Sequence, residues 1–375
     1  MLSPQKMYSL FLQNRLEFFT GVPDSLLKDF CTYVNNQAYQ NKHIIAANEG
    51  NAIALAAGYH LATGKMGVVY MQNSGLGNCI NPLTSLTDPE VYSIPLLLLI
   101  GWRAEPGVKD EPQHKKMGRI TPDLLKSIEI PYAILPASQV EAEKSIAEAV
   151  FYMKKNQAPY AILVKANTFE SYPPQKKQQT PFPLNREQAL RLLVPQLGSE
   201  DRVVSTTGKT SRELFELREE LQQGHEKDFL TVGSMGHASS IALGVALQRP
   251  EHSIYCLDGD GALIMHAGAL ATIGKTQSPN FKHIVINNFA HDSVGGQSTA
   301  ADILDIPALA LAQGYKAAFS ARTEEEIKAG IEKIKKVAGP ALLEIQCNKG
   351  ARENLGRPTR TPLENKQDFM KFASS

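Results

Sequence analysis

The stretch that decides the fold runs from Cys256 to Gln297 and reads CLDGDGALIMHAGALATIGKTQSPNFKHIVINNFAHDSVGGQ. An apolar run over 254–257 stops at Asp258-Gly259-Asp260-Gly261, and a second over 284–286 stops at Asn287-Asn288. Short apolar runs bounded in this way predict buried strands. Because ligands of open parallel sheets bind beyond the carboxyl ends of the strands, we expect Asp260 and Asn288 to face one point.

Asp260 and Asn288 would bring a carboxylate and an amide oxygen to that point. These ligands suit a hard cation such as Mg2+, with phosphate oxygens completing its shell. Gly259 and Gly261 let the backbone approach a phosphate closely and donate its N–H groups. A lone Gly-Asp-Gly is more often only a turn, and Asn-Asn only a strand terminator. The pair at this spacing is more specific than either motif alone.

Length and composition describe an ordinary globular chain. The protein has 375 residues, 43% hydrophobic and 21% charged, with a formal net charge of +1. This length predicts two domains, and the charge gives no reason to expect nucleic acid or an anionic membrane as partner. No stretch is long and apolar enough to span a bilayer. The amphipathic N-terminus is unlike a signal peptide, and four widely spaced cysteines show no disulfide pattern, so we expect a cytoplasmic protein.

Strand and helix patterns alternate on both sides of Ser171–Leu184, SYPPQKKQQTPFPL. That stretch is rich in Pro, Lys and Gln and has no periodicity, so it is predicted to be a linker. The chain is thus predicted to hold two α/β domains, residues 1–170 and 185–375, each with a doubly wound parallel sheet. Residues 101–119, after the apolar run at 95–100, are expected to form a long charged loop.

Gly-Asp-Gly after one strand and Asn-Asn after the next resembles the metal and diphosphate motif of thiamine diphosphate enzymes. The resemblance covers nearly the whole chain, with 1–170 similar to the pyrimidine-binding domain and 185–375 to the diphosphate-binding domain. The segments GVPDSLL, TTGKTSREL, SMGHASSIALG and GARENLGRP resemble the short two-domain members, the phosphonopyruvate and sulfopyruvate decarboxylases. The linker at 171–184 is too short for the third domain of the larger decarboxylases. The His-His pair of pyruvate decarboxylases is also missing.

The resemblance implies roles for two segments that bind the cofactor. Glu49, in AANEGNAIALAAGYHLATGK, matches the glutamate that hydrogen-bonds the pyrimidine N1′ and promotes the loss of the thiazolium C2 proton. By itself it reads as an acidic residue at a helix N-terminus. Met235, in Gly233-Ser234-Met235-Gly236, matches the residue that wedges between the two cofactor rings, and Gly233 the carbonyl that accepts from the 4′-amino group. Without the resemblance, Met235 would be taken as core filler.

The resemblance also implies a Mg2+ ion and a diphosphate beyond the second sheet. The implied metal ligands are Asp260, Asn288 and the backbone carbonyl of Ala290, where many family members have glycine. The residues that match positions whose backbone meets the diphosphate are Gly261, Ala262 and Ser293.

The implied reaction is the non-oxidative decarboxylation of a 2-oxo acid with a second anionic group. The first expectation is 3-phosphonopyruvate, giving phosphonoacetaldehyde and CO2 in phosphonate biosynthesis; sulfopyruvate follows closely, and an acetolactate-synthase-like carboligase is third. A non-catalytic Mg-nucleotide module is disfavoured, because binding alone needs no acid at N1′. Asp24 or His114 would relay protons, although Asp24 is equally a helix N-cap.

The anionic head group requires Arg or Lys donors. The basic residues available for it are Arg103, Lys109, Lys115, Lys116, Arg119, Lys209, Arg212, Arg352 and Arg357. The sequence does not choose among them, and the loop at 103–119 is equally explained as a solvated loop of mixed charge. The resemblance further implies a homo-oligomer, at least a dimer, with sites formed between subunits.

Overall fold

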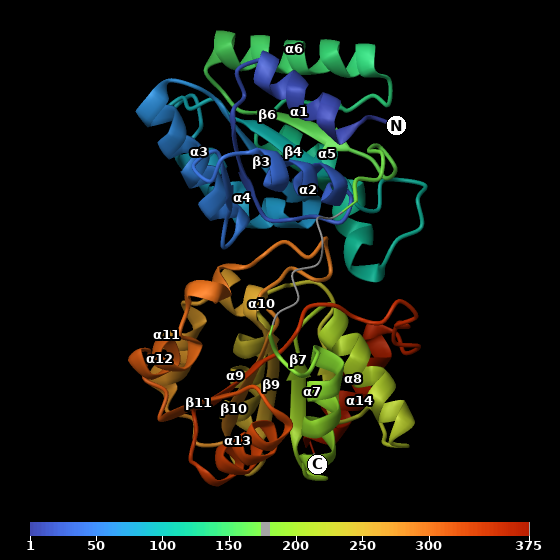
Figure 1. Ribbon diagram of the computed structural model, residues 1–375, viewed down its shortest axis with the longest axis vertical. Helices are drawn as coiled ribbons and strands as arrows, with labels where there is room; N and C mark the ends of the chain where they lie inside the picture. The colour runs from blue at the N-terminus through green and yellow to red at the C-terminus, as the bar shows by residue number, and fades with distance from the viewer. Residues whose placement is uncertain (174–180, 375) are drawn as a thin grey trace. The chain divides into compact units, whose positions relative to one another are not determined.

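The computed structural model describes residues 1–173 and 181–374 and divides the chain into two compact units, Met1–Lys177 and Gln178–Ser375 (Figure 1). The predicted linker at 171–184 lies partly outside the described residues. Within the described part of the chain, no helix is long and apolar enough to cross a membrane.

The first unit alternates strands and helices from its beginning. Its strands are β1 (Phe18–Gly21), β2 (His43–Ile45), β3 (Gly67–Gln72), β4 (Leu97–Gly101), β5 (Tyr132–Ile134) and β6 (Tyr160–Val164). Its helices are α1 (Pro4–Gln13), α2 (Lys28–Gln37), α3 (Glu49–Thr63), α4 (Leu76–Ser85), α5 (Pro112–Ser127) and α6 (Gln139–Asn156), with a 3-10 turn η1 (Asn73–Gly75).

The second unit repeats the alternation. Its strands are β7 (Arg202–Ser205), β8 (Asp228–Leu230), β9 (Ile254–Gly259), β10 (Phe281–Asn287), β11 (Ala317–Ala321) and β12 (Ala341–Gln346). Its helices are α7 (Arg186–Leu193), α8 (Lys209–Glu220), α9 (Ala238–Gln248), α10 (Asp260–Met265), α11 (Ala269–Thr276), α12 (Ile306–Ala312), α13 (Glu324–Lys336) and α14 (Pro362–Ser374), with 3-10 turns η2 (Val194–Gln196) and η3 (Ala300–Ile303).

Both units contain a six-stranded sheet in which every strand pair is parallel. The order is β2-β1-β3-β4-β6-β5 in the first sheet and, read from its other edge, β8-β7-β9-β10-β12-β11 in the second. The two orders are the same topology, so the chain uses one fold twice. The predicted fold class, two doubly wound parallel-sheet domains, is confirmed.

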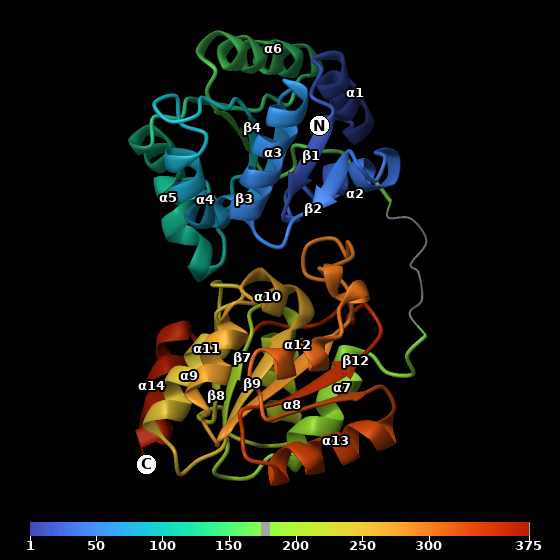
Figure 2. The same cartoon turned by 90° about the vertical axis from the view of Figure 1, so that its left-hand side faces the viewer.

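Helices cover both faces of each sheet, as Figures 1 and 2 show for each unit. In the first unit α1, α2 and α6 contribute to one apolar core, and α3, α4 and α5 to the other. In the second unit α7, α8 and α13 line one face, and α9 to α12 with α14 the other. Burial on both faces explains why strands such as β4 are apolar at every position.

One expectation about the first unit is wrong. Residues 101–119 are not a loop throughout, because α5 begins at Pro112 and carries His114, Lys115, Lys116 and Arg119. Proline is well suited to the first turn of a helix, where its missing N–H is not needed. The apolar positions that bury one face of α5 lie mostly beyond residue 117, so the charged first turns conceal the helix.

Candidate active site

Glu49 begins α3 at the carboxyl edge of the first sheet. The side chain of Asn48 caps the helix by accepting from the N–H of Asn51, and Gly64 ends it in a left-handed conformation. Glu49 is buried, and its Oε2 accepts a hydrogen bond of 2.7 Å from Asn78 Nδ2 on α4. A Cβ at Gly75 would lie 2.4 Å from Oε1, so only glycine leaves room for the carboxyl there.

Asp24 lies in the turn after β1, at the same edge of the sheet. It is fully buried, and its Oδ2 accepts from the N–H groups of Leu26 and Leu27 at 2.8 and 3.2 Å. The other oxygen, Oδ1, is buried without a hydrogen-bond partner. Burial raises the pKa of Asp24 to about 6, against the lowering effect of those N–H groups and Arg103. Asp24 is not the N-cap of α2, which is Leu27, but it holds the turn that leads into the helix.

Three of the basic residues considered for the head group are already paired within their own units, and the others are described by their exposure. Arg103 donates two hydrogen bonds to Asp110, whose pKa they hold at about 2 although burial opposes this. In the second unit Arg212 donates to the carbonyls of Leu355 and Gly356, and Arg352 pairs with Glu187 and Glu216. The exposed residues are Lys109, Lys115, Lys116, Arg119 and Arg357, whereas His114 and Lys209 are half-buried.

The second unit brings Asp260 and Asn288 together. Strands β9 and β10 are parallel neighbours, with Gly259 paired to Ile286, so both residues follow the carboxyl ends of adjacent strands. Asp260 is buried, and its carboxylate accepts from the backbone N–H of Asn288 and from Thr299 Oγ1 at 2.5 Å. Burial nevertheless raises the pKa of Asp260 to about 6. A buried carboxylate of this kind gains from a nearby cation, which restores the stability of its charged form.

The segment from Asn288 to Thr299 folds back toward Asp260. Ala290 forms an antiparallel bridge with Ser298, and the N–H of Thr299 donates to the carbonyl of Phe289. Ala290 is buried, and its N–H donates to Asn288 Oδ1 at 3.2 Å.

Gly261 and Ala262 open α10, directly after Asp260. A Cβ at Gly261 would lie 3.2 Å from His291, and one at Gly236 would lie 2.9 Å from the carbonyl of Ala262. The Gly233-Ser234-Met235-Gly236 turn therefore packs beside the first turn of α10.

The turn after β7 contacts two other segments at the same edge of the sheet. The N–H of Gly233 donates to Thr207 Oγ1 at 3.0 Å. A Cβ at Gly208 would lie 3.0 Å from Ser293 Oγ. The edge beyond β7, β8, β9 and β10 therefore collects every residue predicted for the diphosphate and the metal.

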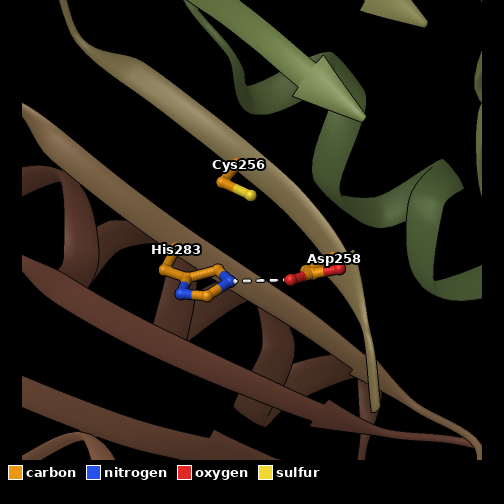
Figure 3. A group of neighbouring side chains, drawn as sticks. All are labelled: Cys256, Asp258 and His283. Atoms are coloured by element: carbon orange, nitrogen blue, oxygen red, sulfur yellow. Dashed lines mark hydrogen bonds and ion pairs between the residues drawn. The ribbon is translucent and has the colours of Figure 1, made fainter. Parts of the chain in front are cut away.

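A second polar cluster lies in the interior, farther back along the same strands (Figure 3). Cys256 and Asp258 on β9 and His283 on β10 are buried, with their possible ligand atoms within 4.8 Å of one another. His283 contacts Asp258 Oδ2 at 3.4 Å through Nε2 and the hydroxyl of Tyr315 at 3.0 Å through Nδ1. Asp258 Oδ1 also accepts from the N–H of Gly259. Because both ring nitrogens are engaged, we interpret the cluster as a hydrogen-bonded chain that anchors the turn before Asp260.

Sequence reasoning missed several residues that hold the predicted ones in place. Asn78 and Gly75 shape the setting of Glu49, and Thr299 bonds Asp260. The Gly-rich turn over 73–78, which follows a strand, was a usable signal for the first two. Thr299 carried none, because its contact depends on how the segment after β10 folds back.

Comparison with known proteins identifies the class. Residues 6–123 match the N-terminal TPP-binding domain of the thiamine pyrophosphate enzymes, and residues 207–345 match the C-terminal TPP-binding domain. The chain therefore belongs to the thiamine pyrophosphate enzyme family.

Individual relatives narrow the class. Phosphonopyruvate decarboxylase of Streptomyces viridochromogenes is 35% identical, over 95% of this chain and 91% of the relative. Phosphonopyruvate decarboxylase of Streptomyces hygroscopicus is 34% identical, over 94% of this chain and 90% of the relative. Sulfopyruvate decarboxylase of Methanosarcina acetivorans is 27% identical, over 92% and 91%. The resemblance seen in the sequence is confirmed, and the chain is a thiamine diphosphate-dependent decarboxylase.

The setting of Asp24 predicts a pH-dependent gain in stability for Asp24→Asn. In the folded protein the pKa is raised from 3.8 to about 6. The stability that protonated Asp24 contributes is therefore complete below pH 3.8 and lost as the pH rises through 6. A neutral amide avoids this loss, so the variant should be more stable than wild type at pH 7.5, by up to about 3 kcal/mol.

Urea unfolding at a series of pH values measures this effect. The advantage of Asp24→Asn should shrink toward pH 4, whereas Asp123→Asn, at an exposed position, should show no such trend. An Asp24→Asn protein that is less stable than wild type at pH 7.5 would contradict the prediction.

Proposed function

We propose that this protein catalyses the thiamine diphosphate- and Mg2+-dependent decarboxylation of 3-phosphonopyruvate to phosphonoacetaldehyde and CO2, a step of phosphonate biosynthesis. The observation that carries the proposal is the buried carboxyl of Glu49, held on one oxygen by Asn78 and given space by Gly75. The family membership supports the cofactor, and two relatives near 35% identity that are named phosphonopyruvate decarboxylases support the substrate. We also propose a cytoplasmic location, because all four cysteines are buried free thiols.

The residues of the first unit fit a role at the pyrimidine ring. Asn78 uses Oε2 of Glu49, so Oε1 is the oxygen we assign to N1′ of the cofactor. When bound, thiamine diphosphate supplies the carbon nucleophile at C2 and accepts the electron pair that CO2 leaves behind. Glu49 holds a proton at N1′ and thereby promotes the loss of the C2 proton.

The residues of the second unit fit a Mg2+ ion and a diphosphate. Asp260, Asn288 and the carbonyl of Ala290 would supply only oxygen ligands, the type that Mg2+ takes. The raised pKa of the buried Asp260 supports a cation there, since a cation compensates the buried negative charge. Gly261, Ala262 and Ser293 would meet the diphosphate, while Gly233, Ser234 and Met235 would contact the pyrimidine and thiazolium rings.

Asp24 is the residue we favour for proton transfer to the product carbon. Its pKa near 6 and its unpartnered Oδ1 suit a group that gives and takes a proton near neutral pH. His114, half-buried in the first turn of α5, is the second candidate.

For the phosphonate we propose the exposed basic residues around the start of α5. Arg103, Arg212 and Arg352 already use their guanidinium groups within their own units. Lys115 and Lys116 are exposed in the first two turns of α5. Gly118 of the same helix packs against the backbone of Arg103 and Ala104, which follow β4. A sulfopyruvate substrate differs only in the head group, and the relative from Methanosarcina acetivorans keeps it as the second candidate. An acetolactate-synthase-like carboligase is a more distant third.

We further propose a homo-oligomer in which two chains complete each site. Glu49 and Asp260 belong to different units, so each unit holds half of the residues proposed for the cofactor. The helix that follows Glu49 has no Asp, Glu, Lys or Arg beyond its first residue, and α9 has none at all. Exposed apolar residues such as Leu61 and Leu247 on these helices suit burial against a second copy.

The proposed substrate is tested by assaying phosphonopyruvate, sulfopyruvate and pyruvate side by side with thiamine diphosphate and Mg2+. Phosphonopyruvate should give the highest kcat/KM. Lys115→Met and Lys116→Met should reduce that value about 10- to 100-fold per lost charged hydrogen bond, with little effect on pyruvate. Lys126→Met, at the far end of the same helix, is the matched control. Equal losses for both substrates would place the phosphonate site elsewhere.

The role of Glu49 predicts that Glu49→Gln still binds the cofactor. The C2 proton of the bound cofactor should exchange at least about a hundredfold more slowly than in wild type. Glutamine keeps an oxygen for Asn78 but cannot drive proton movement at N1′. Deuterium exchange at C2, quenched and read by NMR, measures this step without turnover, and Glu90→Gln serves as an exposed control. Wild-type exchange in Glu49→Gln would reduce Glu49 to a residue at a helix end.

Shared sites predict complementation between two inactive variants. Glu49→Gln and Asp260→Ala are unfolded together, refolded, and assayed as a mixture. If each site takes Glu49 from one chain and Asp260 from the other, a mixed dimer has one site with both substitutions and one with neither. Activity should then return to about a quarter of wild type when the chains mix at random. If each chain builds its own site, every site stays defective and the mixture stays inactive.

A further inference from the structure

Asp292 joins four segments of the second unit that are distant in sequence. Its Oδ2 accepts from Asn288 Nδ2 at 2.8 Å, from the N–H of Gly350 at 2.9 Å and from Arg186 Nη1 at 3.2 Å. Its backbone carbonyl accepts from Lys209 Nζ at 2.9 Å. One carboxylate oxygen thus ties the segment after β10 to the first turn of α7 and to the chain beyond β12.

Arg186 is itself fixed. It is buried at the start of α7, and its Nε and Nη2 donate to the two carboxylate oxygens of Glu213, each at 2.7 Å. A guanidinium whose Nε and Nη2 bind one carboxylate in a bidentate pair is preorganised. Its remaining nitrogen, Nη1, therefore presents a fixed positive charge to Asp292, and Asp292 is confined to one position.

The fixed position of Asp292 determines how the side-chain amide of Asn288 is oriented. Its Nδ2 donates to the carboxylate of Asp292, and its Oδ1 accepts from the N–H of Ala290 at 3.2 Å. Both contacts require the same orientation of the amide. In the reversed orientation, an oxygen would face the carboxylate of Asp292 and an NH2 group would face the N–H of Ala290, so both contacts would be repulsive.

This orientation matters because a cation binds only the oxygen of an amide. Asn288 lies beside Asp260, whose carboxylate accepts from the backbone N–H of Asn288. If the amide were free to turn, its NH2 group would face the cation for part of the time and the metal would lose one ligand. A carboxylate at Asp292 removes that alternative.

We propose that Asp292 is a positioning residue for the metal site: it orients the amide of Asn288 so that Oδ1 faces the cation. Arg186, held by Glu213, keeps Asp292 in place. The inference rests on the proposed Mg2+ site at Asp260 and Asn288. It adds a residue that touches neither the metal nor the substrate. Its loss should weaken Mg2+ binding and so raise the Mg2+ concentration needed for cofactor binding.

The experiment measures binding, not turnover. Thiamine diphosphate is titrated into the full-length protein by calorimetry at a series of Mg2+ concentrations, and the concentration that gives half-maximal cofactor binding is compared. Asp292→Ala should raise this concentration at least tenfold. Asp292→Asn, whose amide oxygen still accepts from Asn288 Nδ2, should stay within about threefold of wild type.

Asp228→Asn separates positioning from stability. Asp228 is buried and accepts from Arg218 Nε and Nη2 at 2.8 and 2.9 Å, so the change weakens a buried ion pair and should lower the melting temperature, but it leaves the contacts of Asp292, Arg186 and Asn288 unchanged. The Mg2+ requirement of Asp228→Asn should stay within about threefold of wild type. If Asp292→Ala fails to fold, Asp292→Ser replaces it, because a serine hydroxyl is too short to reach the amide and the same tenfold loss is expected.

Asp260→Ala completes the set and separates this inference from the function on which it rests. Loss of Mg2+-dependent binding in Asp260→Ala, with a wild-type requirement in Asp292→Ala, would overturn the positioning role alone. A wild-type requirement in Asp260→Ala would overturn the metal site and the inference together. Equal losses in Asp292→Ala, Asp292→Asn and Asp228→Asn would mean that Asp292 has only a structural role.

Discussion

The parallel pairing of β9 with β10 is the constraint on which the rest of the second unit depends. It sets Asp260 and Asn288 after adjacent strand ends and brings the carboxylate of the first against the backbone N–H of the second. Buried side chains support the same turn. Tyr315 contacts His283, His283 contacts Asp258, and Asp258 accepts from the N–H of Gly259. Buried hydrogen bonds therefore hold the turn before Asp260 in place without a ligand.

The two sheets have one topology, yet their edges carry different chemistry. The first places two carboxyl groups, Glu49 and Asp24, in buried settings where glycines make room for them. The second places oxygen-bearing side chains and closely packed glycine turns around Asp260. A fold with a switch in strand order offers the same concave edge in both units, and the side chains in its turns decide what each edge can bind.

Both edges contain buried carboxyl groups, and burial disfavours the charged form of each. Asp24 and Asp260 each have a pKa raised to about 6 by burial. Isolated charges of this kind destabilise a fold unless something compensates them. Their presence at sheet edges is what is expected where function, not stability, determines the residue.

The sequence alone determined the alternation of strands and helices, the division into two α/β units, and the family, because apolar runs that end in Gly-Asp-Gly and Asn-Asn are local patterns. It did not determine which residues support the predicted ones. The start of α5 was hidden by its charged first turns, and the contacts of Asn78, Thr299 and Asp292 join segments far apart in the chain. Only tertiary structure decides such contacts, because hydrogen-bond geometry depends on how separate elements pack, and no spacing in the sequence encodes it.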